Sequence, residues 1–226
     1  MVKQCEGEGM KMSEYCLEMA HINKTFFAMR ALSDASLKVR PSSVHALLGI
    51  NGAGKSTMIK ILSGIYGKDS GEIRIDGKKV QIENTKDAFE NGISTVYQYP
   101  ELVSSFTGYE NIFLGKEMQH ASGKKMNRAK MLKAARELAG RYSIDIDVAK
   151  EVSQMKPVEQ EMICILQALS RNVKILILDE PTSILTEKEK GSLFRTVEEL
   201  RKKGIAIIFI THRLDEVFEI CDELLS

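Results

Sequence analysis

Residues 49–57 decide the fold of this chain, and they read Gly49-Ile50-Asn51-Gly52-Ala53-Gly54-Lys55-Ser56-Thr57. The stretch fits the pattern G-x-x-x-x-G-K-[ST] at every position. In this pattern the glycines let the backbone form a nest of N–H groups around phosphate oxygens. The lysine reaches the β- and γ-phosphates, the next hydroxyl binds Mg²⁺, and the following helix directs its positive end at the anion. The sequence therefore predicts a nucleotide-binding loop.

The segments around this loop predict an α/β fold. A strand is expected over 37–48, running directly into the loop, and a helix over 57–64. In the last third of the chain, apolar strands expected over 174–178 and 205–210 alternate with helices that begin near Thr186, at a capping box, and at Leu214. Such alternation is typical of a parallel sheet covered by helices on both faces.

The middle of the chain adds a hairpin and a helical region. Apolar and polar residues alternate over 72–82 around the turn Asp76-Gly77, which predicts a β-hairpin, and 93–97 is expected as a further strand. Apolar residues at helical spacing predict helices over 127–142 and from Pro157. We expect an inserted helical lobe over about 100–160, within a domain spanning 13–226 that follows a flexible tail, 1–12.

Composition excludes several classes of protein. The 32 basic and 31 acidic residues nearly cancel, which argues against a nucleic-acid partner. No apolar run approaches the roughly 18 residues of a membrane span, and the first residues lack the apolar segment of a signal peptide. The four cysteines show no C-x-x-C spacing, so we expect reduced thiols in a cytosolic protein.

A second acidic element follows the expected strand over 174–178. Its apolar run ends in Asp179-Glu180, at the carboxyl end of a buried strand, where α/β folds bind ligands. Asp179 is expected to hold Mg²⁺ through water, and Glu180 to orient or deprotonate the attacking water. Alone, two acids at a strand end usually mark only a solvated strand end, but together with the phosphate loop they favour a catalytic site.

At this point the chain resembles an ATP-binding cassette, the motor domain of ABC transporters. The likeness extends from about Tyr15 to the end, and the segments that carry it are Leu48 to Thr57, Tyr97-Gln98, Leu178-Asp179-Glu180-Pro181-Thr182 and Thr211-His212-Arg213. The resemblance implies a P-loop NTPase (RecA-like) core with a parallel sheet, an antiparallel β subdomain and the inserted helical lobe. It also implies ATP and Mg²⁺ as cofactors.

Finer features resemble the monosaccharide importers, whose ATPase subunit carries two cassettes in one polypeptide. They are Arg40-Pro41, Val44 to Leu47, Glu110 to Gly115, and His212 to Asp222. The resemblance implies a first cassette whose partners are a second cassette in the same chain, transmembrane permease subunits and, indirectly, an extracytoplasmic sugar-binding protein. It implies a cytoplasmic location, peripheral on the inner face of the cell membrane, with Tyr99 to Phe106 as the expected permease contact.

The resemblance assigns roles to individual residues. Phe26 matches the ring that stacks on adenine, although the neighbouring Phe27 is an alternative. Gln98 matches the glutamine that contacts Mg²⁺ and the attacking water, and His212 the histidine on the γ-phosphate. The implied ATP-binding set is Phe26, Gly49, Asn51, Gly52, Ala53, Gly54, Lys55, Ser56 and Thr57; the metal set is Ser56, Gln98 and Asp179; the catalytic set is Glu180, His212 and Gln98.

One motif departs from the family pattern. The family signature L-S-x-G-[QE] clamps the ATP of the opposite cassette with a serine hydroxyl, glycine N–H groups and a helix dipole. Here the matching residues are Met155, Lys156, Pro157, Val158 and Glu159. The serine is lost, and Val158 is β-branched where a glycine would allow a close backbone approach. We interpret this signature as degenerate.

The departure predicts an asymmetric pair of cassettes. The phosphate loop here would form a complete site with the partner's signature, whereas the partner's loop would face the impaired signature of this chain. Two other functions remain as alternatives: a non-catalytic nucleotide-binding regulatory cassette, and a soluble ABC ATPase not linked to transport. Glu180 and His212 argue against the first, and the short segment between loop and signature, without heptads, against a repair ATPase.

Overall fold

The computed structural model describes residues 14–48, 54–99, 101–119 and 126–225. Two sheets and a group of helices make up these ranges. The strands are β1 (Leu17–Phe26), β2 (Met29–Val39), β3 (Val44–Leu47), β4 (Ser70–Ile75), β5 (Lys78–Val80), β6 (Ile93–Val96), β7 (Ile175–Asp179), β8 (Ala206–Ile210) and β9 (Glu223–Leu225). The α-helices are α1 (Lys55–Leu62), α2 (Thr85–Glu90), α3 (Gly108–Ile112), α4 (Arg128–Arg141), α5 (Pro157–Leu169), α6 (Glu187–Lys202) and α7 (Leu214–Ile220).

The two sheets confirm the predicted α/β class. One sheet has the order β6-β7-β8-β3-β9 with parallel pairing throughout, and the other has the antiparallel order β2-β1-β4-β5. The predicted hairpin is β4–β5, and its turn residues Asp76 and Gly77 both have positive φ, 48° and 75°. Positive φ at both positions is what a type I′ hairpin turn requires.

The prediction of one strand over 37–48 was wrong. The backbone turns between β2 and β3, with Ser42 at φ 55°, so Leu37 lies in the antiparallel sheet and Val44 in the parallel one. The apolar residues form one run in the sequence because both strands bury their side chains, although in different sheets. The sequence analysis also missed β1, α2 and α3, since β1 carries register shifts that break a simple alternation.

The central strands of the parallel sheet, β3, β7 and β8, are buried on both faces. Ile175 and Ile177 of β7 pack in the core shared with the antiparallel sheet, whereas Leu176 and Leu178 pack in the core shared with the helical lobe. This division follows from the two-residue period of a strand. It explains why β7 and β8 are continuous apolar runs and not alternating ones.

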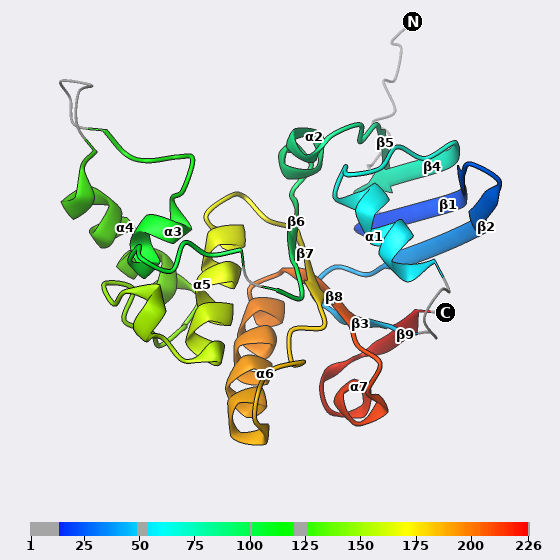
Figure 1. Cartoon of the computed structure of the whole chain (residues 1–226). Coiled ribbons are helices and arrows are strands. Elements are labelled where there is room, and N and C mark those ends of the chain that lie inside the picture. The colour runs from blue at the N-terminus through cyan, green and yellow to red at the C-terminus, as the bar shows by residue number, and fades with distance from the viewer. Residues whose placement is uncertain (1–13, 49–53, 100, 120–125, 226) are drawn as a thin grey trace, which may run out of the picture.

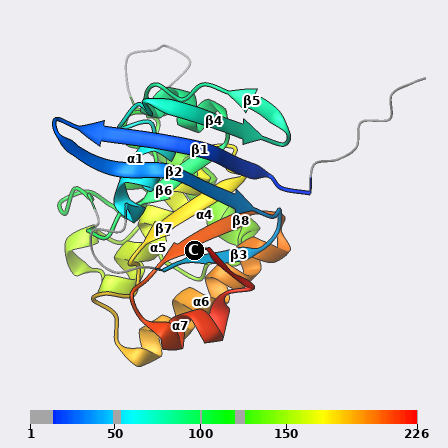
Figure 2. The ribbon, with the colours of Figure 1, turned by 90° about the vertical axis from the view of Figure 1, so that its right-hand side faces the viewer.

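Helix α1 lies between the two sheets. Its buried side chains Met58, Ile59, Ile61 and Leu62 belong to the core that also holds the inner faces of both sheets. The antiparallel sheet and the helical lobe of α3, α4 and α5 therefore lie at opposite ends of the molecule, with the parallel sheet between them (Figure 1). Figure 2 shows the antiparallel sheet stacked over the parallel strands, with α6 and α7 below them.

The expected helical lobe is present, and its helices pack closely. Gly108, at the first turn of α3, has no room for a side chain, because a Cβ there would lie 2.7 Å from Cδ1 of Ile163 on α5. Helix α5 begins at Pro157, as predicted, and continues to Leu169 beside the parallel sheet. It therefore joins the lobe to the core.

Candidate active site

The carboxyl ends of four neighbouring parallel strands meet at one edge of the sheet. Asp179 ends β7 opposite Ile210, which ends β8, and β6 ends just before Gln98. Strand β3 ends at Leu47, before the phosphate loop. Parallel pairing in this order brings residues that are far apart in sequence to one edge, which is where open α/β sheets bind ligands.

Glu180 lies between the other two expected catalytic side chains. The Nε2 amide of Gln98 donates to Oε2 of Glu180 at 3.0 Å, and Nδ1 of His212 lies 3.2 Å from Oε1. The side chain of Glu180 is 27% exposed and that of His212 65% exposed. Glu180 also has a positive φ of 48°, which turns the chain sharply after β7. The structure thus brings the three residues of the predicted catalytic set together.

The surroundings of Asp179 act on the ionisation of its carboxyl in opposite directions. Burial, and then the neighbouring charge of Glu180, raise the pKa of the Asp179 carboxyl, while Lys60 and Lys55 of α1 oppose this rise. The charge of a nearby cation would favour the ionised form in the same way as the lysines do. The carboxylate is therefore held where a metal ion would stabilise it.

The first turn of α1 fits an anion. Gly54 precedes the helix with φ 85° and has no side chain to cap it, and the first turn holds no acidic residue. Lys55, Ser56 and Thr57 form that turn. The N–H groups of a helix first turn, the helix dipole and a lysine together suit a phosphate. The other loop residues of the ATP-binding set, Gly49, Asn51, Gly52 and Ala53, lie outside the described residues, as does Ile50.

The two candidate adenine-stacking rings differ in their surroundings. Phe26 ends β1 and packs edge-on against Tyr66, with ring centroids 5.0 Å apart. Phe27 follows with φ 52° and a fully exposed side chain. Phe26 is thus a ring held in place by a neighbour, and Phe27 is a ring without a packing surface. The assignment of Phe26 stays a prediction.

The signature segment forms the start of α5, and its own carboxylate occupies that helix end. Lys156 is the N-cap, and its backbone N–H donates to Oε2 of Glu159 at 2.7 Å. Lys150 pairs with the same oxygen at 3.0 Å. Burial opposes ionisation of Glu159, but these contacts outweigh it and hold the pKa of Glu159 below its usual value. Met155 is buried and Val158 half-buried. Because both side chains are apolar, neither side chain offers a polar group to a phosphate.

Glu161 is an unusual residue that the sequence analysis missed. It lies on α5 with 4% of its surface exposed, and its Oε1 atom has no hydrogen-bond partner. Burial raises the pKa of Glu161 to about 7. A signal was available in the sequence, because Glu161 lies one turn after Val158 and beside Met162, on the apolar side of the predicted helix.

This burial predicts a pH-dependent stability. A carboxyl whose pKa rises on folding contributes stability that is fully present below the unfolded-state value, 4.5, and is lost as the pH rises through about 7. Glu161→Gln leaves no carboxyl at this position to ionise. The free energy of unfolding of this variant should therefore exceed that of the wild type by about 2–3 kcal/mol at pH 8 and by almost nothing near pH 4.5. Urea unfolding at the two pH values measures the difference.

The control for this prediction is Glu137→Gln on α4, where the side chain is 65% exposed. Its stability should differ from the wild type by less than about 0.5 kcal/mol at both pH values. A gain from Glu161→Gln that is equal at pH 4.5 and pH 8 would contradict a raised pKa as the cause.

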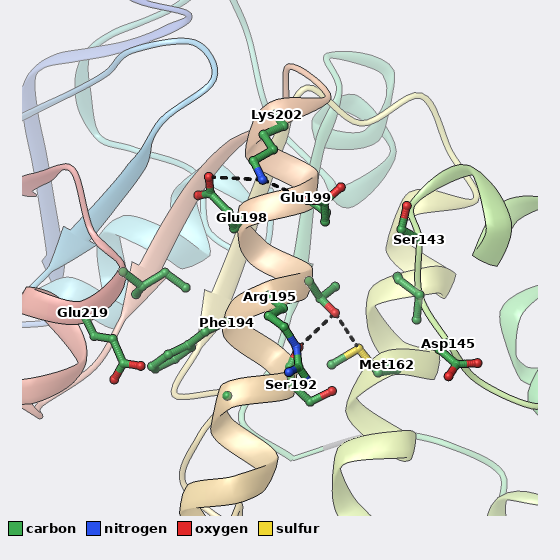
Figure 3. Close-up of a pocket in the computed structure, with 14 residues that line it drawn as sticks. Ser143, Asp145, Met162, Ser192, Phe194, Arg195, Glu198, Glu199, Lys202 and Glu219 are labelled. Atoms are coloured by element: carbon green, nitrogen blue, oxygen red, sulfur yellow. Dashed lines mark hydrogen bonds and ion pairs between the residues drawn. The ribbon is translucent and has the colours of Figure 1, made fainter.

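A separate cavity of about 610 Å³ lies away from this edge of the sheet. It is formed by one side of α6 together with Met162 of α5 and the segment after α4 that holds Ser143 and Asp145 (Figure 3). Thr196 of α6 bridges Met162 and Ser192 there. None of Gln98, Asp179, Glu180 or His212 lines it. The cavity is therefore not part of the candidate active site.

Two further findings concern metals and membranes. Across the described ranges, no group of three or more His, Cys, Asp or Glu side chains is arranged to hold a metal ion. The donors expected for Mg²⁺ are of another kind, namely a hydroxyl, an amide oxygen and one carboxylate, all oxygens as Mg²⁺ prefers. Within the same ranges, no helix has both the length and the apolar character needed to cross a bilayer.

The fold and this site define a class of protein, the ATP-binding cassette. Residues 32–183 match the sequence model of the ABC transporter family. The chain belongs to this family. Over 211 residues it is 44% identical to the galactose/methyl galactoside import ATP-binding protein MglA of Escherichia coli K12 and to the protein of the same name from Salmonella typhimurium LT2. The match covers 93% of this chain and 41% of each relative, so the chain spans about two fifths of their length.

Solved cassettes have the same fold. CbiO1 from Clostridium perfringens, a part of the ABC transporter complex CbiONQ, is 28% identical with a TM-score of 0.78, over 94% of this chain and 84% of that one. The ADP conformation of the cassette MJ1267 superposes with a TM-score of 0.82 at 24% identity, over 94% of this chain and 87% of that one. At that identity the second likeness supports the fold alone.

Proposed function

We propose that this chain binds and hydrolyses ATP to power the import of a monosaccharide, as one half of a head-to-tail pair of cassettes. The observation that carries the hydrolytic part is the position of Glu180, held by Gln98 on one side and His212 on the other. The similarity to the MglA proteins, which are named as import ATP-binding proteins for galactose and methyl galactoside, supports the transported class. A purely regulatory cassette would have no need of this arrangement.

The residues at the sheet edge suit Mg²⁺ and ATP. The amide nitrogen of Gln98 is used by Glu180, so its oxygen is the end available to a cation, beside the carboxylate of Asp179 and the hydroxyl of Ser56. When bound, Mg²⁺ supplies charge that neutralises the β- and γ-phosphate oxygens. Lys55 and the N-terminus of α1 hold the same phosphates, and Phe26 stacks on the adenine.

Hydrolysis follows from the same geometry. Glu180 accepts a proton from the attacking water, while Gln98 restrains the carboxylate in one orientation. His212 contacts the γ-phosphate and the carboxylate together, so it aligns the water with the phosphorus. Each of the three side chains follows the end of a strand within two residues, and sites placed by strands are held more precisely than sites on loops.

The two sites of the pair are proposed to be unequal. At the start of α5 the N–H of Lys156 is already bonded to Glu159, and Val158 provides no polar contact. A phosphate presented by the partner cassette would meet a carboxylate and an apolar side chain, which disfavour it by charge repulsion and desolvation. The partner's phosphate loop is therefore expected to form the impaired site.

A membrane partner is proposed to dock beside β6. A groove of about 220 Å³ there is lined by Tyr97, Tyr99 and Glu101 from one side and by Lys116 and Arg171 from the other. Tyr99 is 71% exposed, and the hydroxyls of Ser94 and Thr95 in the groove are buried without a hydrogen-bond partner. Exposed aromatic rings suit a protein partner. The groove adjoins the expected contact Tyr99 to Phe106, of which Pro100 lies outside the described residues.

Lys55→Ala tests nucleotide binding. Removing the charge that reaches the β- and γ-phosphates is expected to weaken MgATP binding about 100-fold, because a charge-assisted contact to phosphate is lost. The measurement is titration with a fluorescent ATP analogue. Lys86→Ala on α2, where the side chain is 81% exposed, is the matched control and should bind ATP like the wild type. Equal affinity for the two variants would contradict the assignment of the loop.

Transport is tested in cells. The complete protein is expressed with its membrane subunits, and uptake of radiolabelled galactose, ribose and xylose is measured with and without Lys55→Ala. Uptake of at least one sugar should depend on Lys55. Uptake that is equal in both strains for all three sugars would contradict the import function while leaving ATP binding unaffected.

A further inference from the structure

A buried carboxylate lies behind the candidate active site. Glu216 is on α7, 1% exposed, and its Oε2 atom accepts two hydrogen bonds, from Oγ1 of Thr182 at 2.9 Å and from Oγ1 of Thr211 at 2.7 Å. Thr182 follows Glu180 after one intervening proline, and Thr211 directly precedes His212. One carboxylate oxygen therefore joins the two segments that carry the proposed catalytic carboxylate and histidine.

Thr211 transmits this contact to both sides of His212. Its hydroxyl donates to Glu216 and accepts the backbone N–H of Arg213 at 3.0 Å. His212 is thus the central residue of a turn whose two flanking residues are bonded to each other and to Glu216. The N–H of Glu180 also donates to the carbonyl of Ile210, at 3.0 Å, so the segments are joined by backbone as well.

The second oxygen of Glu216 lies near two cationic side chains. Nζ of Lys190 on α6 and Nε of Arg213 each lie 3.4 Å from Oε1. Lys190 is almost completely buried, and its Nζ also pairs with Glu187 at 2.7 Å. Arg213 is further faced by Glu187 and Asp215, at 3.7 Å and 3.6 Å. Without Glu216, the buried Lys190 would keep the exposed carboxylate of Glu187 as its counter-charge, which is unfavourable for a buried cation. Arg213 is only partly buried.

We propose that Glu216 is a positioning residue for ATP hydrolysis. It touches no substrate, but it sets the distance and angle between Glu180 and His212 through Thr182 and Thr211. This inference rests on the proposed function, since it assigns a role within the same site. Supporting contacts of this kind typically change activity 10- to 100-fold when removed, because the catalytic groups lose their alignment.

The first test uses the histidine ring resonances of the chain in solution. The protein has four histidines, so His212→Ala assigns the resonance of His212 directly. Glu216→Gln should shift the ring proton resonances of His212 and leave those of the other three histidines in place. Glu219→Gln, an exposed position one turn further along α7, is the matched control and should move none of them. Thr211→Val removes one of the two hydroxyl donors to Glu216 and should shift the same resonances. It tests the same role if Glu216→Gln does not fold.

The second test is steady-state hydrolysis of MgATP by the complete protein. Glu216→Gln should lower kcat by 10- to 100-fold with the KM for ATP changed less than about threefold. In a His212→Ala background it should cause almost no further loss, because the separation of Glu180 and His212 that Glu216 sets has no role once the imidazole is absent.

The outcomes separate the two proposals. Unmoved His212 resonances in Glu216→Gln, or a kcat loss that multiplies with that of His212→Ala, would overturn the positioning role. A wild-type protein that hydrolyses no ATP would overturn the proposed function, and the resonances would then still decide whether Glu216 positions His212.

Discussion

Glu180→Gln is expected to lower the kcat for MgATP about 100- to 1000-fold in the complete protein while leaving ATP affinity within about twofold. The amide keeps the size of the side chain and can still meet Gln98 and His212, but it cannot accept a proton from water. General-base catalysis typically contributes a factor of this size. Because Glu180 does not hold the phosphates, binding should survive.

The measurement is single-turnover hydrolysis, followed by analysis of the nucleotide that remains bound. The variant should retain ATP where the wild type retains ADP. Glu90→Gln on α2, 64% exposed, removes an equivalent charge away from the site and should hydrolyse ATP at the wild-type rate. A Glu180→Gln protein that still turns over ATP within tenfold of the wild type would mean that another group takes the proton.

The same variant reports on the signature when the isolated chain is studied by light scattering with MgATP. Blocked hydrolysis should let any closed dimer accumulate, but the chain is expected to stay monomeric. Two copies would have to present Lys156 and Val158 to each other's ATP, and the start of α5 is occupied by Glu159. An ATP-dependent dimer of this variant would show that the segment still clamps ATP, and the asymmetric pair would have to be abandoned.

The second large effect is expected from repair of that segment. Lys156→Ser together with Val158→Gly, in the Glu180→Gln background, should convert the monomer into an ATP-dependent dimer. The serine supplies a hydroxyl and the glycine permits close approach of the backbone N–H groups to the γ-phosphate. Both residues lie at the N-cap and first turn of α5, where serine is a favoured cap and glycine costs at most about 1 kcal/mol.

Light scattering with MgATP, with MgADP and without nucleotide measures this gain. The dimer should form with MgATP alone. Lys133→Ser with Gly140→Ala, both on α4, is a control pair that replaces a lysine by serine and changes a small residue away from the signature, and it should remain monomeric. A repaired chain that stays monomeric with ATP bound would indicate that another part of the interface, and not the signature, prevents pairing.

Most of the fold was accessible from local sequence signals. The capping box at Thr186, the turn Asp76-Gly77 and the apolar runs of β7 and β8 are short-range patterns, and all appear in the structure as predicted. The prediction of one strand over 37–48 was wrong because side chains buried in two different sheets give the same apolar pattern along the sequence. Register shifts hid β1 for a related reason, since only its partner strands define which side chains face inward.

By itself, the sequence predicted which residues carry the chemistry: the loop with Lys55 and Ser56, the pair Asp179-Glu180, and the departures at Lys156 and Val158. Such motifs are readable because phosphate and metal binding require particular residue types at adjacent positions. Only the tertiary structure decided that Glu180 meets Gln98 and His212, that Glu159 occupies the start of α5, and that Glu161 and Glu216 are buried. These contacts either join segments that are distant in sequence or depend on which face of a helix is covered. Both are determined by the packing of the elements against one another, which local sequence patterns do not specify.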